Sequence, residues 1–414
     1  MNTQFIQPQL SALKPLWPLA QQLAIDIQNS KVTEASLKQM GLALWKALDI
    51  QHYTAHHLIM SSDNPRVHQL PWECLYHPHY GFLGQHLEYG VSRYTRDAQF
   101  IAPSTGPLKI LLFTAQPRQT ITLATDIEQH YLRAQLQPAI AQGHIQLLAP
   151  NDGRFSTLVQ LVHQHHWDLV LLSGHGHPAE FVFEDEAGQA QAVAADTLAA
   201  SVQQAQISCM VFTACYSSPG LALSVHQAGI PHVIGMQAAL IDKASQIFIS
   251  QLCLALSQGI RLATAVQQGR LALTQLLANN EVWRDNRLRP CADPSVGQWC
   301  LPVLFSCDPS QTLTHQRPQV LQSTRQTPET VFIGRRQALR TLTQALQQGR
   351  YRHLVITGPA GRGKTALAHQ LVLSLAEYGF KVLKYQHQEP FNQFLAQAVL
   401  LPPATPLSQL IDEL

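Results

Sequence analysis

The chain has 414 residues and a formal net charge of +2, and 46% of its residues are hydrophobic. This length predicts two to three domains, and the apolar fraction is enough for sizeable cores. A net charge so close to zero gives no strong field for nucleic acid or for an anionic membrane. We therefore expect neither of them as a partner.

Two further features predict a cytoplasmic protein. The start of the chain lacks a basic segment followed by an apolar run, and no stretch reaches the roughly 18 apolar residues that span a bilayer. The 7 cysteines are odd in number and include no C-x-x-C pair, which is typical of reduced thiols rather than of a disulfide framework.

By pattern, the chain divides into four segments. Residues 1–105 are mixed α/β, residues 106–307 alternate strands with helices, residues 308–330 form a linker rich in Gln, Thr, Pro and Ser, and residues 331–414 open a further domain. In the first segment the predicted elements are helices over 16–27 and 34–48, extended stretches over 57–61 and 69–76, and a hairpin-like run over 82–94.

The second segment predicts an α/β/α sandwich. Its expected strands are 109–115, 144–150, 168–172, 209–213, 232–236 and 300–306. Its expected helices are 122–141, 155–165, 196–204, 221–228, 242–256 and 260–278, followed by a polar loop over 279–298. Alternation of this kind is typical of a mostly parallel sheet covered on both faces, here with six strands.

A histidine and a cysteine follow two of these strands. SGHGH covers residues 173–177 and FTACYSS covers residues 212–218. The carboxyl ends of core strands are where open α/β sheets carry their chemistry, so His175 and Cys215 predict a Cys–His dyad. A thiol with a pKa near 8.5 is mostly protonated, and a neighbouring imidazole would favour the attacking thiolate. The other interpretation of Cys215 is an inert core thiol.

Five stretches of the chain resemble a CHAT domain, a bacterial relative of caspases and separases. They are residues 70–84, 167–176, 211–218, 229–248 and 298–305, in the family's order. The resemblance implies a caspase-like fold, with residues 1–105 as the amino-terminal part of the CHAT region. It also implies a cysteine endopeptidase that acts on protein substrates and needs no cofactor.

Carried over by position, the resemblance assigns three site residues. His175 would be the catalytic histidine and Cys215 the nucleophile. Gly176, without a side chain, would let the scissile carbonyl come close, and its backbone N–H would form an oxyanion hole with that of Cys215. The matching Trp72 and Glu73 would brace the amino-terminal part against the sheet.

Asp242 has two interpretations, which stay open. As the first residue of a predicted helix it would serve as its N-cap. Alternatively, it would line the pocket for the substrate residue before the cut and favour Arg or Lys there. In separases an acidic residue lies a few positions earlier, near Ala239 of this chain, so the preference of that pocket is open.

Other histidines and cysteines favour no further site. Several histidines cluster before and after the strand over 168–172, but the chain has 20 histidines and no zinc-type spacing, so we predict no metal site. Cys209 lies at the start of a predicted strand and is expected in the core.

A second motif, GPAGRGKT, covers residues 358–365 and fits G-x-x-x-x-G-K-[ST] in full. It lies between a predicted buried strand over 353–357 and a helix over 366–376, with a strand over 381–385 after it, so we expect the first βαβ part of a P-loop NTPase domain. The residues expected to hold ATP or GTP with Mg²⁺ are Gly358, Gly361, Gly363, Lys364 and Thr365.

The run FIGR at residues 332–335 resembles the entry to STAND-type signalling ATPases. No apolar strand ending in acidic residues follows Lys364, so we expect an incomplete NTPase segment, either the start of a longer domain or a vestige. The resemblance implies self-association through this part. It also implies nucleotide-driven control of the peptidase in a bacterial signalling or defence system. The alternative function is a non-catalytic CHAT scaffold attached to a STAND-type NTPase.

Overall fold

In the computed structural model, the described residues form two compact units, residues 1–340 and residues 341–414. The described residues are 2–29, 31–50, 56–95, 100–118, 125–177, 179–240, 242–274, 281–284, 287–290, 296–315, 335–350, 354–359, 361–378 and 380.

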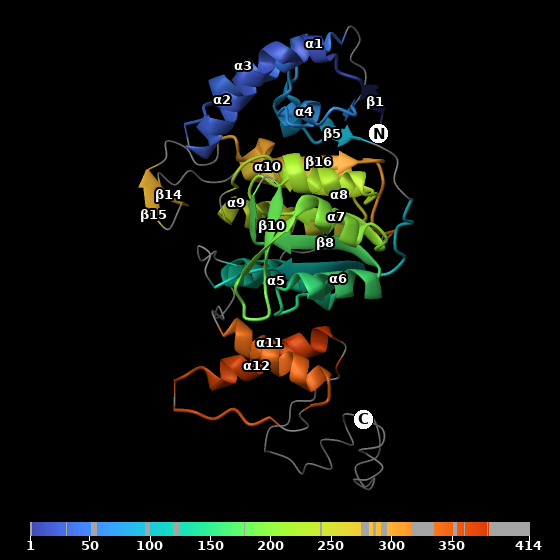
Figure 1. Ribbon diagram of the computed structural model, residues 1–414. Helices are drawn as coiled ribbons and strands as arrows, with labels where there is room; N and C mark the ends of the chain where they lie inside the picture. Colours follow the sequence, from blue (N-terminus) through green and yellow to red (C-terminus); the bar gives the residue numbers. More distant parts are fainter. Residues whose placement is uncertain are drawn as a thin grey trace. The chain divides into compact units, whose positions relative to one another are not determined.

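A mostly parallel sheet forms the centre of the first unit (Figure 1). From edge to edge its strands are β1 (Thr3–Ile6), β2 (His57–Ser61), β5 (Gly90–Tyr94), β16 (Pro302–Ser306), β13 (His232–Met236), β12 (Ile207–Phe212), β8 (Trp167–Ser173), β6 (Leu108–Thr114) and β7 (Ile145–Leu148). Only β13 and β16 pair antiparallel; every other neighbouring pair is parallel.

The predicted count of six strands is wrong, because this sheet has nine. The three additional strands, β1, β2 and β5, come from the first 105 residues and extend the sheet beyond β16. A strand at a sheet edge leaves a row of backbone N–H and C=O groups unpaired, and β5 removes β16 from the edge by pairing with it at Arg93 and Phe305. Because these three strands do not alternate regularly with helices, their place in the sheet was not readable from pattern.

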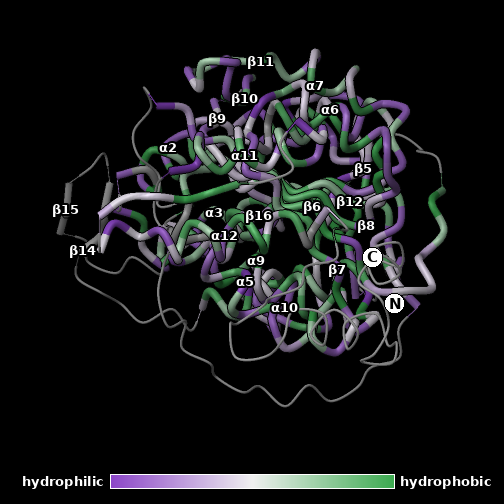
Figure 2. The backbone as a smooth tube through the Cα atoms, turned by 90° about the horizontal axis from the view of Figure 1, so that it is seen from below, coloured by the Kyte–Doolittle hydropathy of each residue, from purple (hydrophilic) through white to green (hydrophobic). Residues whose placement is uncertain are grey.

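Helices cover both faces of the sheet (Figures 1 and 2). One face carries α5 (Thr125–Ala141), α9 (Asp242–Ser257) and α10 (Leu262–Thr274); the other carries α6 (Phe155–Gln164), α7 (Ala195–Val202) and α8 (Leu223–Gln227). Every residue of β8, β12, β13 and β16 is buried. Burial on both faces explains why these strands are continuous apolar runs, drawn green at the centre of Figure 2.

The amino-terminal part includes helices α1 (Leu10–Leu13), α2 (Trp17–Gln28), α3 (Glu34–Leu48) and α4 (Pro65–His68). Trp72 and Glu73, in the same part of the chain, are both fully buried. Glu73 forms an ion pair with Arg93, and Arg270 of α10 reaches the same carboxylate at 3.4 Å. Arg93 also donates to the Leu70 carbonyl at 2.8 Å. The Glu73–Arg270 contact, between the amino-terminal part and α10, agrees with the predicted bracing role of Glu73, whereas that of Trp72 stays a prediction.

The structure also contains smaller sheets. A three-stranded antiparallel sheet consists of β9 (His175–His177), β10 (Glu180–Glu184) and β11 (Ala190–Ala194). The hairpin β14 (Glu281–Arg284) and β15 (Arg287–Pro290) lies within the expected polar loop, and β3 (Tyr76–His77) pairs with β4 (Gly81–Phe82).

The start of the predicted linker is packed onto the first unit. Leu313 is fully buried, and the Leu262 N–H donates to the Gln311 carbonyl at 2.9 Å. Residues 316–330, the rest of that prediction, lie outside the described residues. Helix α11 (Arg336–Gln347) follows and contains the end of the first unit, Arg340.

In the second unit, α12 (Lys364–Glu377) confirms the predicted helix after the glycine-rich loop. The buried strand predicted over 353–357 is wrong for its described residues: 354–357 form no strand, and Val355 is 81% exposed. A strand needs a neighbour for its backbone hydrogen bonds, and the partner predicted over 381–385 lies outside the described residues. Over both units, no described helix is long and apolar enough to cross a membrane.

Candidate functional site

Cys215 lies in a tight turn beyond the carboxyl end of β12. Its side chain is partly exposed, while Ala214 before it and Ser217 after it are buried. Tyr216 has a left-handed backbone with φ of 55°, which is costly for a residue with a side chain and is common at functional turns. The Ser217 hydroxyl accepts a 2.9 Å hydrogen bond from the backbone N–H of Met236 in β13, so the turn is tied to the next strand.

His175 lies two residues beyond the neighbouring strand, β8, and opens β9. The backbone N–H of Ala115 donates to the Ser173 carbonyl at 2.9 Å, which continues the pairing of β6 and β8 past the strand end. His175 then pairs with Val182 of β10. The histidine is therefore held by the edge of a small antiparallel sheet rather than by an irregular loop.

Gly176 brings the histidine segment and the cysteine turn together. A Cβ atom at Gly176 would lie 2.7 Å from the Ala214 Cβ and 3.2 Å from the Cys215 carbonyl oxygen. Only glycine allows this approach, so the two predicted segments touch at the carboxyl edge of β8 and β12. The space of the missing side chain is filled by Ala214.

Most of the described cysteines are shielded from solvent. Cys74, Cys209, Cys253 and Cys300 are buried, and Cys215 and Cys307 are partly exposed; Cys291 lies outside the described residues. Burial raises the pKa of the Cys209 and Cys253 thiols. The predicted core position of Cys209 is confirmed. Cys307 follows β16, at the opposite edge of the sheet from Cys215, since its N–H donates to the Pro231 carbonyl ahead of β13.

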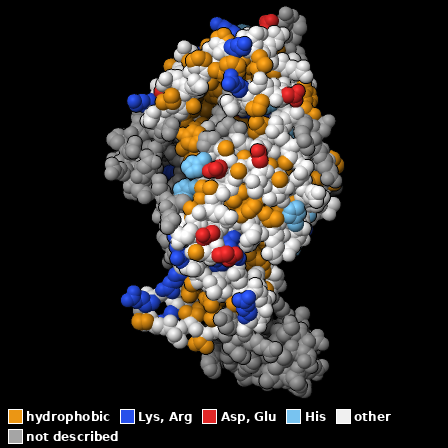
Figure 3. All heavy atoms as spheres, in the orientation of Figure 1, with side chains coloured by type: hydrophobic (Ala, Val, Ile, Leu, Met, Phe, Trp, Pro, Cys, Tyr) orange, Lys and Arg blue, Asp and Glu red, His pale blue; other side chains and the backbone are white. Residues whose placement is uncertain are grey.

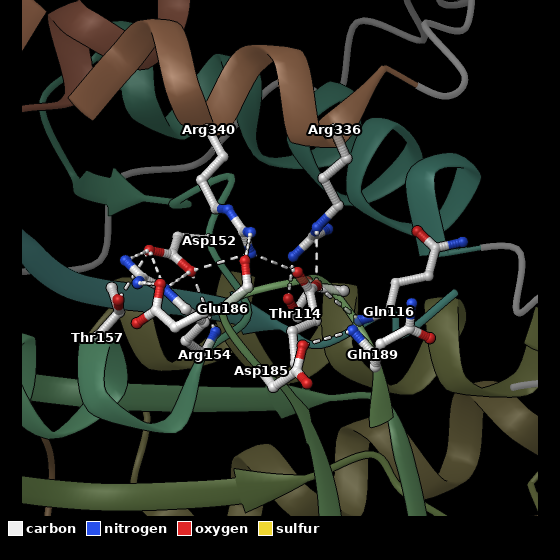
Figure 4. A network of polar contacts seen from close by, with 11 residues as sticks. Thr114, Gln116, Asp152, Arg154, Thr157, Asp185, Glu186, Gln189, Arg336 and Arg340 are labelled. Carbon is white, nitrogen blue, oxygen red and sulfur yellow. Dashed lines mark hydrogen bonds and ion pairs between the residues drawn. The ribbon is translucent and has the colours of Figure 1, made fainter. Parts of the chain in front are cut away.

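A network of carboxylates and guanidinium groups lies beyond β6, β7 and β10, and the sequence pattern did not predict it (Figure 4). Asp152 accepts from Arg154 at 2.7 Å and from the Thr157 hydroxyl at 2.8 Å. Burial raises the pKa of Asp152, but these hydrogen bonds outweigh it and leave that pKa below its usual range. Arg154 also pairs with Glu186. One feature of the sequence could have indicated a polar site here: Asp152, like His175, comes just after an expected strand.

Asp242 is the first residue of α9, as predicted, but its side chain lies outside the described residues. Both interpretations, helix cap and substrate pocket, therefore stay predictions. The clustered histidines have separate surroundings: the His163 ring bonds the Ser201 carbonyl at 2.8 Å, and His165 contacts the Trp167 ring. Among the described residues, no group of three His, Cys, Asp or Glu side chains could hold a metal ion.

The glycine-rich loop of the second unit contains three glycines with positive φ. Gly358, Gly361 and Gly363 have φ of 148°, 75° and 72°. Lys364 opens α12, and its ammonium donates to the Pro359 carbonyl at 2.8 Å. The described part of this unit contains one acidic residue, Glu377, at the far end of α12 and about 20 Å along the helix. Phosphate binding by this loop stays a prediction, and the described residues of this unit supply no carboxylate for Mg²⁺ beside it.

Several solved structures are similar to this chain. The Arg-specific cysteine proteinase gingipain R (RgpB) is 11% identical with a TM-score of 0.41, covering 75% of this chain and 78% of that chain. A complex of Porphyromonas gingivalis RgpB pro- and mature domains is 10% identical with a TM-score of 0.41, covering 75% and 79%. The Saccharomyces cerevisiae separase–securin complex is 16% identical with a TM-score of 0.37, covering 67% of this chain and 17% of that chain.

A search of curated proteins finds no match. Two family models match. Residues 335–400 match the Novel STAND NTPase 3 model, in agreement with the predicted P-loop segment. Residues 31–292, more than half of the chain, match the CHAT domain model and contain both His175 and Cys215. The chain belongs to the CHAT domain family.

Proposed function

We propose that the chain is a cysteine endopeptidase that cleaves protein substrates with Cys215 as nucleophile and His175 as acid and base. One observation carries the proposal: Gly176 lies against Ala214 and the Cys215 carbonyl, so the histidine segment touches the cysteine turn at the carboxyl edge of the sheet. The proposal is also supported by the partial exposure of Cys215, since four of the other described cysteines are buried.

In the proposed reaction, the Cys215 thiolate attacks the carbonyl carbon of the scissile peptide bond. The negative charge that develops on the oxygen would be stabilised by the backbone N–H groups of Gly176 and Cys215. Protonated His175 gives its proton to the leaving amine as the C–N bond breaks, leaving a thioester on Cys215. Neutral His175 then takes a proton from water, whose oxygen attacks the thioester and releases the new carboxylate.

We propose that this reaction needs no cofactor. Charged side chains are few on the face drawn in Figure 3, which is compatible with a protein substrate rather than nucleic acid or a membrane. For the second unit we propose weak binding of ATP or GTP with Mg²⁺ through the glycine loop, Lys364 and Thr365. Control of the peptidase by a complete NTPase module of this kind, self-association through that module and a cytoplasmic setting in bacterial signalling or defence belong to the same proposal.

The test compares the reactivity of all the thiols in one sample. The chain is treated with limiting iodoacetamide at pH 7, and the labelling rate of each cysteine is measured by mass spectrometry. An activated thiolate should make Cys215 react at least about tenfold faster than Cys307, which is also partly exposed. His175→Ala should remove that advantage.

Equal labelling of Cys215 and Cys307 in the unmodified chain would overturn the proposal. It would support the second function, a non-catalytic CHAT scaffold. An advantage of Cys215 that survives in His175→Ala would show that another group activates the thiol, and it would contradict the proposed dyad.

A further inference from the structure

Glu184 is a buried carboxylate at the end of β10 and is 4% exposed. The backbone N–H of Gln116, just beyond β6, donates to it at 3.0 Å. Its own backbone N–H donates to the Gly153 carbonyl, beyond β7, at 2.9 Å. A Cβ at Gly153 would lie 2.3 Å from a Glu184 carboxylate oxygen, so the surrounding backbone closes tightly around this group.

Two arginines from much later in the chain, Arg336 and Arg340 (labelled in Figure 4), form ion pairs with this carboxylate. Arg340 contacts Glu184 at 3.1 Å and Asp152 at 3.7 Å, and it donates to the Glu186 carbonyl at 3.1 Å. Arg336 pairs with Glu184 at 3.2 Å and donates to the Thr114 carbonyl at the end of β6. Both arginines belong to the first compact unit, which ends at Arg340.

Glu184 is connected to His175 through one hairpin. On β10, Val182 pairs with His175, and Glu184 lies two residues further along the same strand face. Phe181, the pairing partner of Gly176, is fully buried, and its ring would lie 3.0 Å from a Cβ at Gly174. A shift of the Glu184 end of β10 therefore moves the strand that positions His175.

We propose that Arg336 and Arg340 are positioning residues of the peptidase site, which hold the His175 hairpin in place through Glu184. The inference rests on the proposed function. It assigns a role in the first unit to residues that lie within the match to the STAND NTPase model, which begins at residue 335. Without the two guanidinium groups, Glu184 would be a buried carboxylate whose remaining donor among the described residues is the backbone N–H of Gln116, and the hairpin would have to open to hydrate it.

An alternative role for the two arginines is to block the site by occupying it as a substrate would, but their geometry does not fit this role. They lie four residues, about one turn, apart at the start of helix α11, whereas an extended peptide adds to a sheet edge as a strand. Both guanidinium groups also contact backbone carbonyls, of Thr114 and Glu186, as structural arginines do. A positioning role and a blocking role predict opposite effects when the arginines are removed.

The experiment measures the rate of Cys215 carboxymethylation at pH 7 and at pH 9.5 in the full chain. The variants are Arg336→Met, Arg340→Met and Glu184→Gln, with the exposed Arg350→Met as the matched control. Each change in the network should slow labelling at pH 7 by about tenfold, because His175 no longer lies where it stabilises the thiolate. At pH 9.5, where an ordinary thiol ionises by itself, the rates should converge.

Two further variants separate positioning from folding. Arg340→Lys keeps the charge and should recover part of the lost rate. Glu184→Gln combined with Arg340→Met should be no slower than either single change, because both act through one contact. The thermal midpoint of each variant identifies samples that are unfolded. If Arg340→Met is among them, folded Arg336→Met and Glu184→Gln decide the question, since labelling at pH 7 as fast as in the unmodified chain would contradict positioning.

Unchanged labelling at pH 7 in folded Arg336→Met and Arg340→Met variants would overturn the inference. So would faster labelling, which a blocking role predicts. Both outcomes can be told apart from failure of the proposed function. If the proposed function fails, Cys215 already reacts no faster than Cys307 in the unmodified chain.

Discussion

The peptidase unit and the P-loop of this chain use glycine for different reasons. In the peptidase unit, a Cβ at Gly176 or at Gly235 would lie less than 3 Å from neighbouring atoms, 2.7 Å from Ala214 and 2.8 Å from Ser218. In the P-loop, a Cβ at Gly361 or Gly363 would meet nothing within 4 Å, although both residues have positive φ.

The peptidase unit needs glycine at Gly176 and Gly235 for close packing, whereas the P-loop needs glycine for its backbone conformation. A substitution in the peptidase site should therefore disturb its neighbours, whereas one in the P-loop should act on the loop alone. The peptidase site joins two segments that are distant in the sequence, so its geometry depends on the whole fold. The conformation of the P-loop depends on one continuous segment. Each of the following changes tests that contrast.

The largest effect is expected from Cys215→Ala. This change removes the nucleophile and should abolish peptide-bond cleavage, while the thermal midpoint stays within a few degrees because a partly exposed thiol contributes little packing. Cys307→Ala, at the other edge of the sheet, should keep full activity. A large loss of stability in Cys215→Ala, with activity retained in Cys215→Ser, would identify a core cysteine instead.

Acid should destabilise the peptidase unit through its buried histidines. Burial lowers the pKa of His57 to about 3, of His68 to about 4 and of His232 to about 4, from 6.5. The folded state keeps these rings neutral, so the unfolded state binds protons first as the pH falls below 6.5. The free energy of unfolding should then drop until about pH 4, by about 3 kcal/mol for His232 alone.

Urea unfolding followed from pH 7 to pH 4.5 measures this loss. Because the His232 ring bonds Ser306 and Gln311, His232→Leu should flatten the pH dependence while lowering stability at pH 7. The exposed His369 of the second unit gives the control variant, His369→Gln, which should leave the slope unchanged. A pH-independent free energy of unfolding in the unmodified chain would contradict the expectation.

Gly176→Ala tests the close approach itself. The new methyl group would overlap Ala214 and must push the histidine segment away from the cysteine turn. We expect about 10- to 100-fold lower peptidase activity and a loss of about 1–3 kcal/mol of stability. Gly106→Ala is the control, because a Cβ there meets nothing within 4 Å. Equal activity of the two variants would show that the approach does not matter.

The smallest effect on the peptidase should come from the P-loop. Lys364→Ala should weaken nucleotide binding, measured by calorimetry, and leave peptide cleavage by this chain unchanged. We also expect no ATP turnover, because the described residues place no carboxylate beside the loop for Mg²⁺. Turnover above background that disappears in Lys364→Ala would contradict this expectation.

The chemistry-bearing parts of the fold were readable from the sequence because they are local. Strand β13 covers residues 232–236 as predicted, and helix α3 covers 34–48, since apolar runs and helical periodicity are properties of neighbouring residues. The order of strands and helices was enough to put His175 and Cys215 at one edge of a parallel sheet.

Contacts between distant residues were not readable in this way. β5 joins the sheet through β16, more than 200 residues later, and Arg340 reaches Glu184 across 156 residues. The β9–β11 sheet was missed because HGH is too short to carry an alternating pattern. No local pattern encodes such pairings, so the sequence predicted the site residues but not the network that holds them.

The most direct test of the central claim is cleavage of a peptide library by the purified chain. New amino termini are identified by mass spectrometry for the unmodified chain, for Cys215→Ala and for His175→Ala. A Cys–His peptidase predicts a set of new termini in the unmodified chain that is absent from both variants. The same termini in Cys215→Ala, or none in an unmodified chain whose Cys215 labels no faster than Cys307, would contradict it.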